Sequence, residues 1–260
     1  MAKTKIKNKR FIATSLVIAL LIIAVLGLIN YDIQKSANSN NQDIQVISSN
    51  SDFLENIQLS ENTVVMKVPA IDEAGKGTTA DLIVELKPGT GKTLVDIDSL
   101  LFWADTQQSI RVAKNVAQET TGKSLSNYDI VYKIYANASI IGGPSAGSAL
   151  TIATIAVIEN KKPKSEVMIT GSINRDGSLG PVGDIIEKAK ASKEAGATIF
   201  LVPLLQSREV IYETSEHCEK FGMAEICTTE TKPKKVDIKN ETGVDIIEVE
   251  NIQEAENYFF

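Results

Sequence analysis

Gly142-Gly143-Pro144-Ser145-Ala146-Gly147, followed by an almost wholly apolar run to Ile158, is the stretch that decides the fold. A helix formed by this run has almost no polar face, so it must be buried on most sides. A serine at the start of such a helix lies near unpaired backbone N–H groups and the positive end of the helix dipole. Both stabilise an oxyanion, which makes Ser145 a candidate nucleophile. The alternative is that Ser145 only caps the helix, as serines often do.

A second segment, Pro181-Val182-Gly183-Asp184-Ile185-Ile186-Glu187-Lys188, opens another helix and supplies a candidate base. On a helical projection Lys188 lies with the apolar residues, whereas Lys190 and Lys193 lie on the opposite side. Burial lowers the pKa of a lysine and leaves it neutral, the form that accepts a serine proton. The alternative is a lysine that snorkels from the edge of the apolar stripe. Together, the two segments predict a buried Ser145–Lys188 dyad, which is typical of a hydrolase.

These segments resemble the proteolytic domain of Lon proteases, most closely the membrane-associated archaeal kind. The resemblance covers roughly residues 62 to 260 and is carried by Gly143–Gly147, Met168–Ile173, Gly177–Gly183, Glu187–Lys188, Ala195–Ala197 and Leu201–Pro203. It implies an α/β (α+β) fold of mixed sheets and helices, with Ser145 as nucleophile and Lys188 as base. It also implies that Thr170 is a supporting residue that hydrogen-bonds near the lysine.

The chain departs from the Lon pattern at two positions close to the dyad. Many Lon enzymes have an acidic residue directly before Gly-Pro-Ser, where this chain has Gly142, and a second glycine after Pro-Val-Gly, where it has Asp184. Neither difference removes the dyad, but both bear on the loop conformation and on the pH dependence. The residues expected to form the oxyanion and substrate loop are Gly142, Gly143, Pro144 and Ala146.

Other catalytic arrangements lack the residues that they need. His217 is the only histidine, and it is expected in an ordinary polar helix over residues 207–221, so a Ser-His-Asp triad is not predicted. One histidine and two cysteines without spaced partners predict no metal site, and no cofactor is expected. Cys218 and Cys227 can pair or remain free thiols.

Residues 88–93, Pro-Gly-Thr-Gly-Lys-Thr, end like a phosphate-binding loop, but Leu86 stands where that motif requires its first glycine. A glycine-rich turn between two strands explains the segment better. Lon proteases usually couple the proteolytic domain to an ATPase, for which 260 residues leave no room. We therefore expect ATP-independent proteolysis, with reliance on a partner ATPase as the alternative.

The first 29 residues have the pattern of a membrane anchor. Residues 11–29 are uncharged and almost wholly apolar, long enough to span a bilayer, and residues 1–10 form a basic tail with five positive charges. This charge bias predicts a single-pass protein of the cell membrane with a cytoplasmic tail and an extracytoplasmic catalytic domain. A cleaved signal peptide is the alternative. Sequons at Asn137 and Asn240 fit an exported domain, although membrane-bound archaeal Lon enzymes are understood to work on the cytoplasmic side.

Residues 30–51 are rich in Asn, Ser, Gln and Asp and predict a polar linker, after which residues 52–260 are expected to form the protease domain. Without residues 1–29 the chain keeps 22 basic against 33 acidic residues, a formal net charge of −11. This acidic balance excludes nucleic-acid binding, because phosphates need a basic footprint.

Hydrophobic periodicity predicts alternating strands and helices within this domain. Strands are expected over residues 63–68, 81–86, 93–97, 130–136, 167–170 and 198–202, with a hairpin turn at 174–177 between 171–173 and 178–180. Helices are expected over 106–121, 145–159, 184–194, 207–221 and 252–258.

The sequence thus predicts a membrane-anchored, ATP-independent serine endopeptidase that hydrolyses unfolded or extended polypeptides. The resemblance implies a homo-oligomer, a hexameric ring whose active sites face an inner chamber. The alternative from another class is a catalytically silent module that serves assembly or binding. The presence of both Ser145 and Lys188 speaks against that alternative.

Overall fold

The structure is a computed structural model that describes residues 62–96, 101–102, 104–136, 140–141, 143–222 and 224–260. All of these residues fall in one compact unit, Leu59–Phe260. The predicted tail, anchor and linker, residues 1–51, lie outside the described part of the chain. Among the helices that are described, none is long and apolar enough to cross a bilayer.

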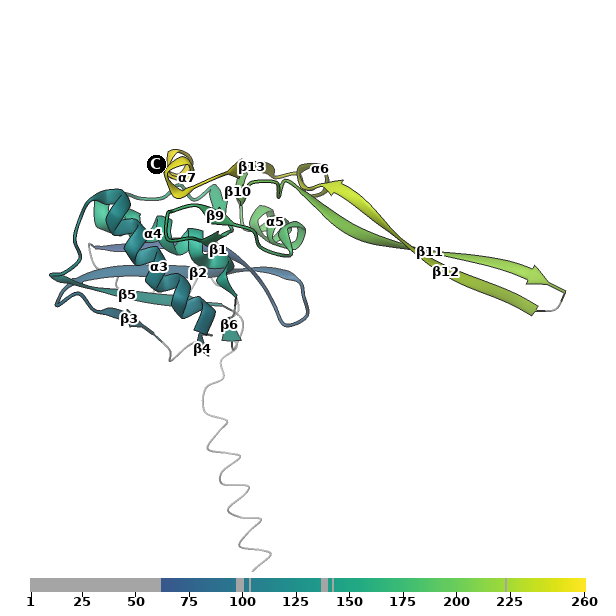
Figure 1. Ribbon diagram of the computed structural model, residues 1–260, viewed down its shortest axis with the longest axis horizontal. Helices are drawn as coiled ribbons and strands as arrows, with labels where there is room; N and C mark the ends of the chain where they lie inside the picture. Colours follow the sequence, from purple (N-terminus) through teal and green to yellow (C-terminus); the bar gives the residue numbers. More distant parts are fainter. Residues whose placement is uncertain (1–61, 97–100, 103, 137–139, 142, 223) are drawn as a thin grey trace, which may run out of the picture. The chain divides into compact units, whose positions relative to one another are not determined.

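Two sheets form the framework (Figure 1). The larger sheet has the order β1-β2-β5-β3 and consists of β1 (Thr63–Ile71), β2 (Gly77–Pro88), β5 (Tyr128–Tyr135) and β3 (Thr93–Val95). Its neighbours are antiparallel except β3 and β5. The smaller sheet is parallel and has the order β13-β10-β7, from β13 (Asp245–Val249), β10 (Ile199–Pro203) and β7 (Val167–Ile169).

Three pairs of strands complete the β structure: β4 (Leu101–Phe102) with β6 (Ile140–Ile141), β8 (Ser172–Ile173) with β9 (Leu179–Gly180), and β11 (Arg208–Phe221) with β12 (Ala224–Asp237). The helical elements are α3 (Ala104–Thr121), the 3-10 turn η1 (Pro144–Ala146), α4 (Gly147–Glu159), α5 (Ile185–Glu194), α6 (Ile238–Thr242) and α7 (Ile252–Phe259). The predicted mixed α/β fold is confirmed, as is the short hairpin between β8 and β9.

Helix α4 is the centre of the main core. It lies against β1 and β2 on one side and α3 on the other, and every residue from Gly147 to Val157 is buried. This agrees with the burial predicted from its apolar run, in which each fully buried Leu or Ile side chain contributes about 1.5–3 kcal/mol. The helix ends at Asn160, whose left-handed backbone (φ 55°) stops the helical hydrogen bonding.

A second, smaller apolar cluster surrounds α5. It brings Ile185 and Ala189 of that helix together with Phe200 of β10, Ile238 of α6 and Val244. The serine turn therefore lies at the edge of one core, whereas the lysine helix belongs to the other. The relative position of Ser145 and Lys188 is set by how these two packed groups meet.

Two glycines permit the close packing on which this arrangement depends. A Cβ at Gly147 would lie 2.7 Å from Ile173 Cγ2 and 2.8 Å from the Ile173 backbone nitrogen, so only glycine lets the start of α4 approach β8. A Cβ at Gly77, the first residue of β2, would collide with the carbonyl oxygen of Glu187. Gly77 thus lets α5 pack directly on the large sheet.

The helix predicted over residues 207–221 is wrong. These residues form β11, which pairs with β12 in a long antiparallel ribbon (Figure 1). The charged residues of the segment suggested a helix, but Val210, Ile211 and Tyr212 favour strands, and the partner strand contributes β-forming threonines at 228, 229 and 231. Cross-strand pairing therefore overrides local helix propensity.

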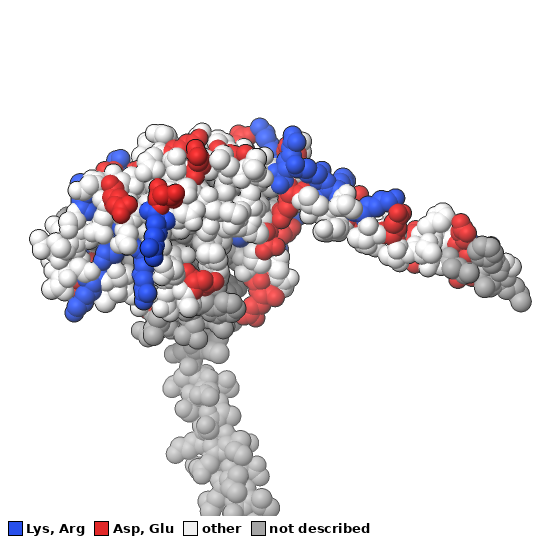
Figure 2. Space-filling view, viewed as in Figure 1, with Lys and Arg blue, Asp and Glu red and all other residues white. Residues whose placement is uncertain are grey.

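Acidic and basic side chains are interspersed on the face of the unit that Figure 2 shows. Basic residues gather on β12 at Lys232, Lys234 and Lys235, but Lys232 pairs with Glu230 and Lys234 pairs with Glu213. These ion pairs balance the charge of two of the three lysines.

Candidate active site

The serine turn is held by backbone contacts from two directions. The Gly171 N–H donates to the Ser145 carbonyl oxygen (N···O 3.0 Å), and the Thr170 hydroxyl donates to the same oxygen at 3.3 Å. The Ser148 N–H donates in return to the Gly171 carbonyl at 3.0 Å. The segment that follows β7 therefore locks the main chain of the turn, and the fully buried Thr170 contacts the serine turn at its main chain.

Helix α3 holds the approach to the turn. The Asp105 carboxylate accepts the Gly143 N–H at 3.0 Å, and the Thr106 hydroxyl donates to the Gly143 carbonyl at 3.4 Å. Gly143 has a backbone φ of 94°, a region that favours glycine, and Pro144 then starts the 3-10 turn. Gly142, which belongs to the predicted oxyanion loop, lies outside the described residues.

Ser145 does not cap a helix. The cap residues of η1 and α4 are Gly143 and Ala146, and neither helix start has a side-chain cap hydrogen bond. Ser145 is half-buried and lines a pocket. The Ser145 side chain therefore does not have the capping role that the sequence had left open.

Lys188 projects from α5 into the same pocket. The residue is only 4% exposed, and its Nζ donates to the Gly183 carbonyl oxygen at 2.9 Å. Burial lowers the pKa of Lys188 from its ordinary value, while the nearby carboxylates of Asp184 and Glu209 act in the opposite direction. The Lys188 side chain points inward, as the helical projection predicted, and it does not snorkel to the surface.

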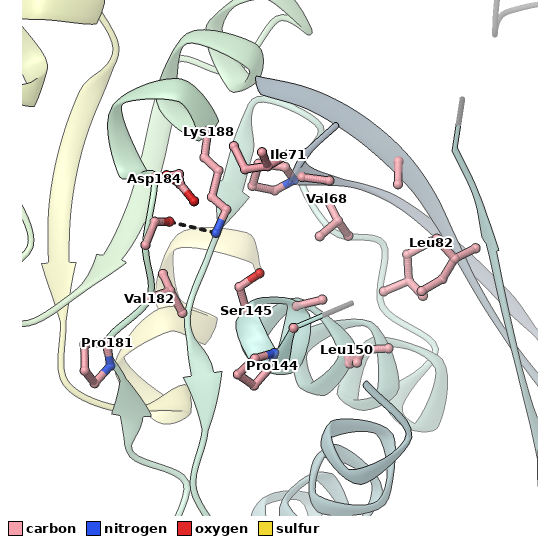
Figure 3. A pocket seen from close by; sticks show the side chains of 17 residues that line it. Val68, Ile71, Leu82, Pro144, Ser145, Leu150, Pro181, Val182, Asp184 and Lys188 are labelled. Carbon is pink, nitrogen blue, oxygen red and sulfur yellow. Dashed lines mark hydrogen bonds between the residues drawn. The ribbon is translucent and has the colours of Figure 1, made fainter. Parts of the chain in front are cut away.

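The pocket has a volume of about 440 Å³, and Figure 3 shows Ser145 and Lys188 on facing sides of it. Its wall is mostly apolar, with Val68, Ala80, Leu82, Ile134, Leu150 and Val182 among the lining residues. Lys188 Nζ donates to the Gly183 carbonyl, and within the described chain no hydrogen bond joins it to Ser145 Oγ. The two side chains share one cavity in which a peptide carbonyl can lie between them.

Asp184 occupies the position where many Lon enzymes have glycine, and the backbone explains why glycine suits it. Its φ and ψ of 57° and 39° are left-handed, a conformation that aspartate tolerates better than most other residues. The substitution therefore keeps the turn before α5 and adds a carboxylate beside Lys188.

Two residues at this site were not predicted from the sequence. Gln206 exchanges two hydrogen bonds with the backbone of Val182, and Glu209 accepts the Ile186 N–H. They are separated from Lys188 by β10 and carry no motif of their own. The one available signal was that Gln206 follows the buried strand β10 by three residues.

Residues 88–93 run from the end of β2 to the start of β3 and form the predicted turn between strands. Its Thr90 and Lys92 N–H groups both donate to the Asp129 Oδ1 atom at 2.8 Å. These hydrogen bonds lower the pKa of the Asp129 carboxyl. The amide groups that a phosphate would need are thus occupied by a carboxylate of the chain itself.

The remaining candidate residues lie on the β11–β12 ribbon. His217 is in a strand and is largely exposed, so the expected helix around it is wrong; its Nε2 lies 3.6 Å from Glu219 Oε1. Cys218 and Cys227 face each other across the ribbon and form a disulfide. Glu216 lies close to both sulfur atoms, but the disulfide leaves these without the thiolate form that a metal requires.

A nucleophile candidate and a buried amine in one pocket define the class of the site, a candidate serine hydrolase centre. Residues 103–226 match the family model described as the Lon protease (S16) C-terminal proteolytic domain, which confirms the resemblance to that domain. The matched segment contains Ser145, Thr170 and Lys188. The matched family is one of serine peptidases.

Curated relatives point the same way. An archaeal Lon protease of Thermoplasma volcanium is 28% identical over 155 residues, which cover 59% of this chain and 24% of the relative. A Lon protease of Methylocella silvestris is 32% identical over 138 residues, 51% of this chain and 17% of the relative. An archaeal Lon protease of Methanothermobacter thermautotrophicus is 28% identical over 125 residues, 48% of this chain and 19% of the relative. The chain thus spans about a quarter or less of the length of these relatives.

Proposed function

We propose that the protein is a membrane-anchored serine endopeptidase that works without ATP and hydrolyses unfolded or extended polypeptides. The observation that carries the proposal is that Ser145 and the buried Lys188 line one pocket. The match of residues 103–226 to the Lon proteolytic domain supports the same chemistry.

In the proposed reaction the Ser145 hydroxyl oxygen attacks the scissile carbonyl, and neutral Lys188 accepts the hydroxyl proton. The lysine then returns this proton to the leaving amine, and water resolves the acyl-enzyme. Backbone N–H groups around Ser145 hold the oxyanion. Of the expected loop residues Gly142, Gly143, Pro144 and Ala146, proline supplies no N–H, and the Gly143 N–H already donates to the Asp105 carboxylate. Thr170 supports the site by fixing the Ser145 carbonyl, which keeps the nucleophile in place.

The shape of the pocket supports a peptide substrate. β1 is an edge strand of the large sheet, and its residues Val68 to Ile71 line the pocket beside Ser145. A strand at the edge of a sheet can form main-chain hydrogen bonds with an extended peptide. In a folded substrate the main-chain groups are already paired, so they cannot form these bonds. The apolar wall formed by Leu82 and Ile134 suits an apolar side chain next to the cleaved bond.

The cellular arrangement is part of the proposal. Residues 11–29 would anchor the chain in the cell membrane, with residues 1–10 in the cytoplasm, residues 30–51 as linker and residues 52–260 as the protease domain outside. The Cys218–Cys227 disulfide supports this orientation, because disulfides persist mainly in oxidising compartments. The exposed Asn240 sequon is compatible with it.

ATP independence is supported by the loop of residues 88–93, whose amides bind Asp129. By resemblance to Lon enzymes, the assembled protein would be a hexameric ring with enclosed active sites. The alternative is a module that is catalytically silent or depends on a partner ATPase. That alternative draws support from Lys188 Nζ, which donates to the Gly183 carbonyl and not to Ser145 in the described structure.

The test is cleavage of unfolded casein by the full chain in detergent micelles, with and without ATP. Ser145→Ala and Lys188→Met should each abolish cleavage, and ATP should change nothing. Ser148→Ala is the matched serine control, because Ser148 is buried one helical turn away and its Oγ has no partner within the described structure. Lys190→Met is the matched lysine control, since Lys190 pairs with Glu187 at the surface of the same helix.

Loss of activity in the first two variants, with both controls active, would support the autonomous peptidase. A correctly assembled wild type that cleaves only with an added ATPase, or not at all, would favour the alternative. Equal activity in Ser145→Ala would contradict the proposed nucleophile.

A further inference from the structure

Gln206, which lies between β10 and β11, and Glu209, the second residue of β11, hold the loop that precedes the lysine helix. Gln206 Nε2 donates to the Val182 carbonyl at 2.6 Å, and the Val182 N–H donates to Gln206 Oε1 at 3.0 Å. Three residues further on, Glu209 Oε2 accepts the Ile186 N–H at 2.9 Å. Gln206 and Glu209 thus hold the loop before α5 at one end and the first turn of α5 at the other.

The first turn of α5 needs such a partner. Asp184 stands at the cap position, but its left-handed backbone leaves its side chain without a capping hydrogen bond. Glu209 satisfies the Ile186 N–H in its place, and its negative charge complements the positive end of the helix. The start of the lysine helix is therefore fixed by a residue from another element.

The atom that holds the lysine lies between these two anchor points. Lys188 Nζ donates to the Gly183 carbonyl, and Gly183 follows Val182 and precedes the first turn of α5. Gly183 itself has no atoms within 4 Å of the place where a Cβ would stand, so side-chain packing does not fix it. The position of its carbonyl depends on the residues at either side.

We propose that Gln206 and Glu209 are positioning residues for Lys188, which set where its amine lies in the pocket. This inference deepens the proposed peptidase function and rests on it for its kinetic consequence. Neither residue lines the pocket that holds Ser145, so they act on the lysine and not on the substrate.

The charges around Lys188 agree with this role. Asp184 and Glu209 are the two carboxylates that oppose the effect of burial on the Lys188 pKa. The other residues that line the pocket, from β1, β2, β5, η1 and α4, are uncharged. Replacing Glu209 by glutamine keeps a hydrogen-bond acceptor for Ile186 but removes one of the two charges, so the pKa of Lys188 should fall further.

The experiment measures the pH profile of kcat/KM for the full chain and for Glu209→Gln, Glu209→Ala and Gln206→Ala. A second readout follows competitive acetylation of Lys188 against pH by mass spectrometry, with the exposed Lys193 of the same helix as internal reference. Glu213→Gln is the matched control, because Glu213 lies further along the same strand and pairs with Lys234 away from the pocket.

Glu209→Gln should move the acid limb of kcat/KM and the acetylation midpoint of Lys188 to lower pH together. Glu209→Ala and Gln206→Ala should lower kcat about tenfold with a smaller change in KM, because the amine is misplaced. Glu213→Gln should match the wild type in both measurements.

An unchanged acetylation midpoint in Glu209→Gln would overturn the inference, whatever the activity. If the wild type proves inactive while that midpoint still moves, the peptidase proposal fails and the positioning of Lys188 stands. Should the alanine variants fail to fold, the near-isosteric glutamine variant carries the test alone.

Discussion

The burial of Lys188 reduces the stability of the fold and at the same time makes its amine a better base. The residue is 4% exposed, and burial lowers its pKa, so the folded protein holds its proton less tightly than the unfolded chain does. A group of this kind reduces stability at neutral pH, and the reduction fades as the pH rises from the folded pKa towards the unfolded value of about 10.4. The same shift makes the amine a better base near neutrality.

Lys188→Met should therefore abolish peptidase activity and leave the protein at least as stable as the wild type at pH 7. Methionine fills a similar volume, and the exposed Gly183 carbonyl that loses its partner can bind water. Thermal melts at pH 7 and at about pH 10 check this, since the advantage of the variant should shrink at the higher value. A Tm at pH 7 well below that of the wild type would mean that the ammonium stabilises the fold.

Helix α5 can pack closely on β2 because Gly77 has no side chain, and this packing places Lys188 in the pocket. Gly77→Ala places a methyl group against the Glu187 carbonyl, which must move together with the helix. We expect a loss of about 1–3 kcal/mol in the free energy of unfolding and a lower kcat. Denaturant melts and kcat measurements check this against Thr78→Ala, the neighbouring strand residue. A kcat equal to that of the wild type would show that the packing of α5 on β2 does not position the base.

The loop between β2 and β3 is organised by the Asp129 carboxylate. Because hydrogen bonds lower its pKa in the folded state, Asp129 stabilises the fold above its unfolded pKa, and this contribution is lost as the pH falls through the lower folded value. Asp129→Ala should lower the Tm at pH 7, and its difference from the wild type should shrink below about pH 4. The exposed Glu119→Gln serves as control. A rise in the wild-type Tm on adding Mg-ATP would contradict the structural role of the loop.

The sequence predicted those elements whose local pattern and packing agree. The apolar run of α4, the alternation in β1 and β5 and the continuously buried stretches of β2 and β10 describe buried surfaces directly. Ser145 lies just before the α4 run, and Lys188 lies on the buried side of α5. The β11–β12 ribbon was missed because its stability depends on a partner strand and a cross-strand disulfide, which no local pattern contains. Gln206 and Glu209 were missed because their role is a long-range contact with the backbone of another segment.

At the scale of the whole molecule, the expected anchor and the side of the membrane remain predictions from residues 1–29. The full chain should sediment with membranes and stay there after a carbonate wash, whereas a chain from residue 30 onward should be released. With intact cells, an impermeant maleimide added after reduction should label Cys218 and Cys227, which are exposed in the folded unit. Labelling only after lysis would place the domain on the cytoplasmic side.

The central claim is that Lys188 activates Ser145 within one pocket, and covalent trapping of the serine tests it most directly. The full chain is incubated with a fluorophosphonate across a range of pH, and the modified peptide is identified by mass spectrometry. The account predicts one label per chain, on Ser145, with a rate that rises with pH through the pKa of Lys188 and is lost in Lys188→Met. Labelling at another residue, or labelling of Ser145 that persists undiminished in Lys188→Met, would contradict it.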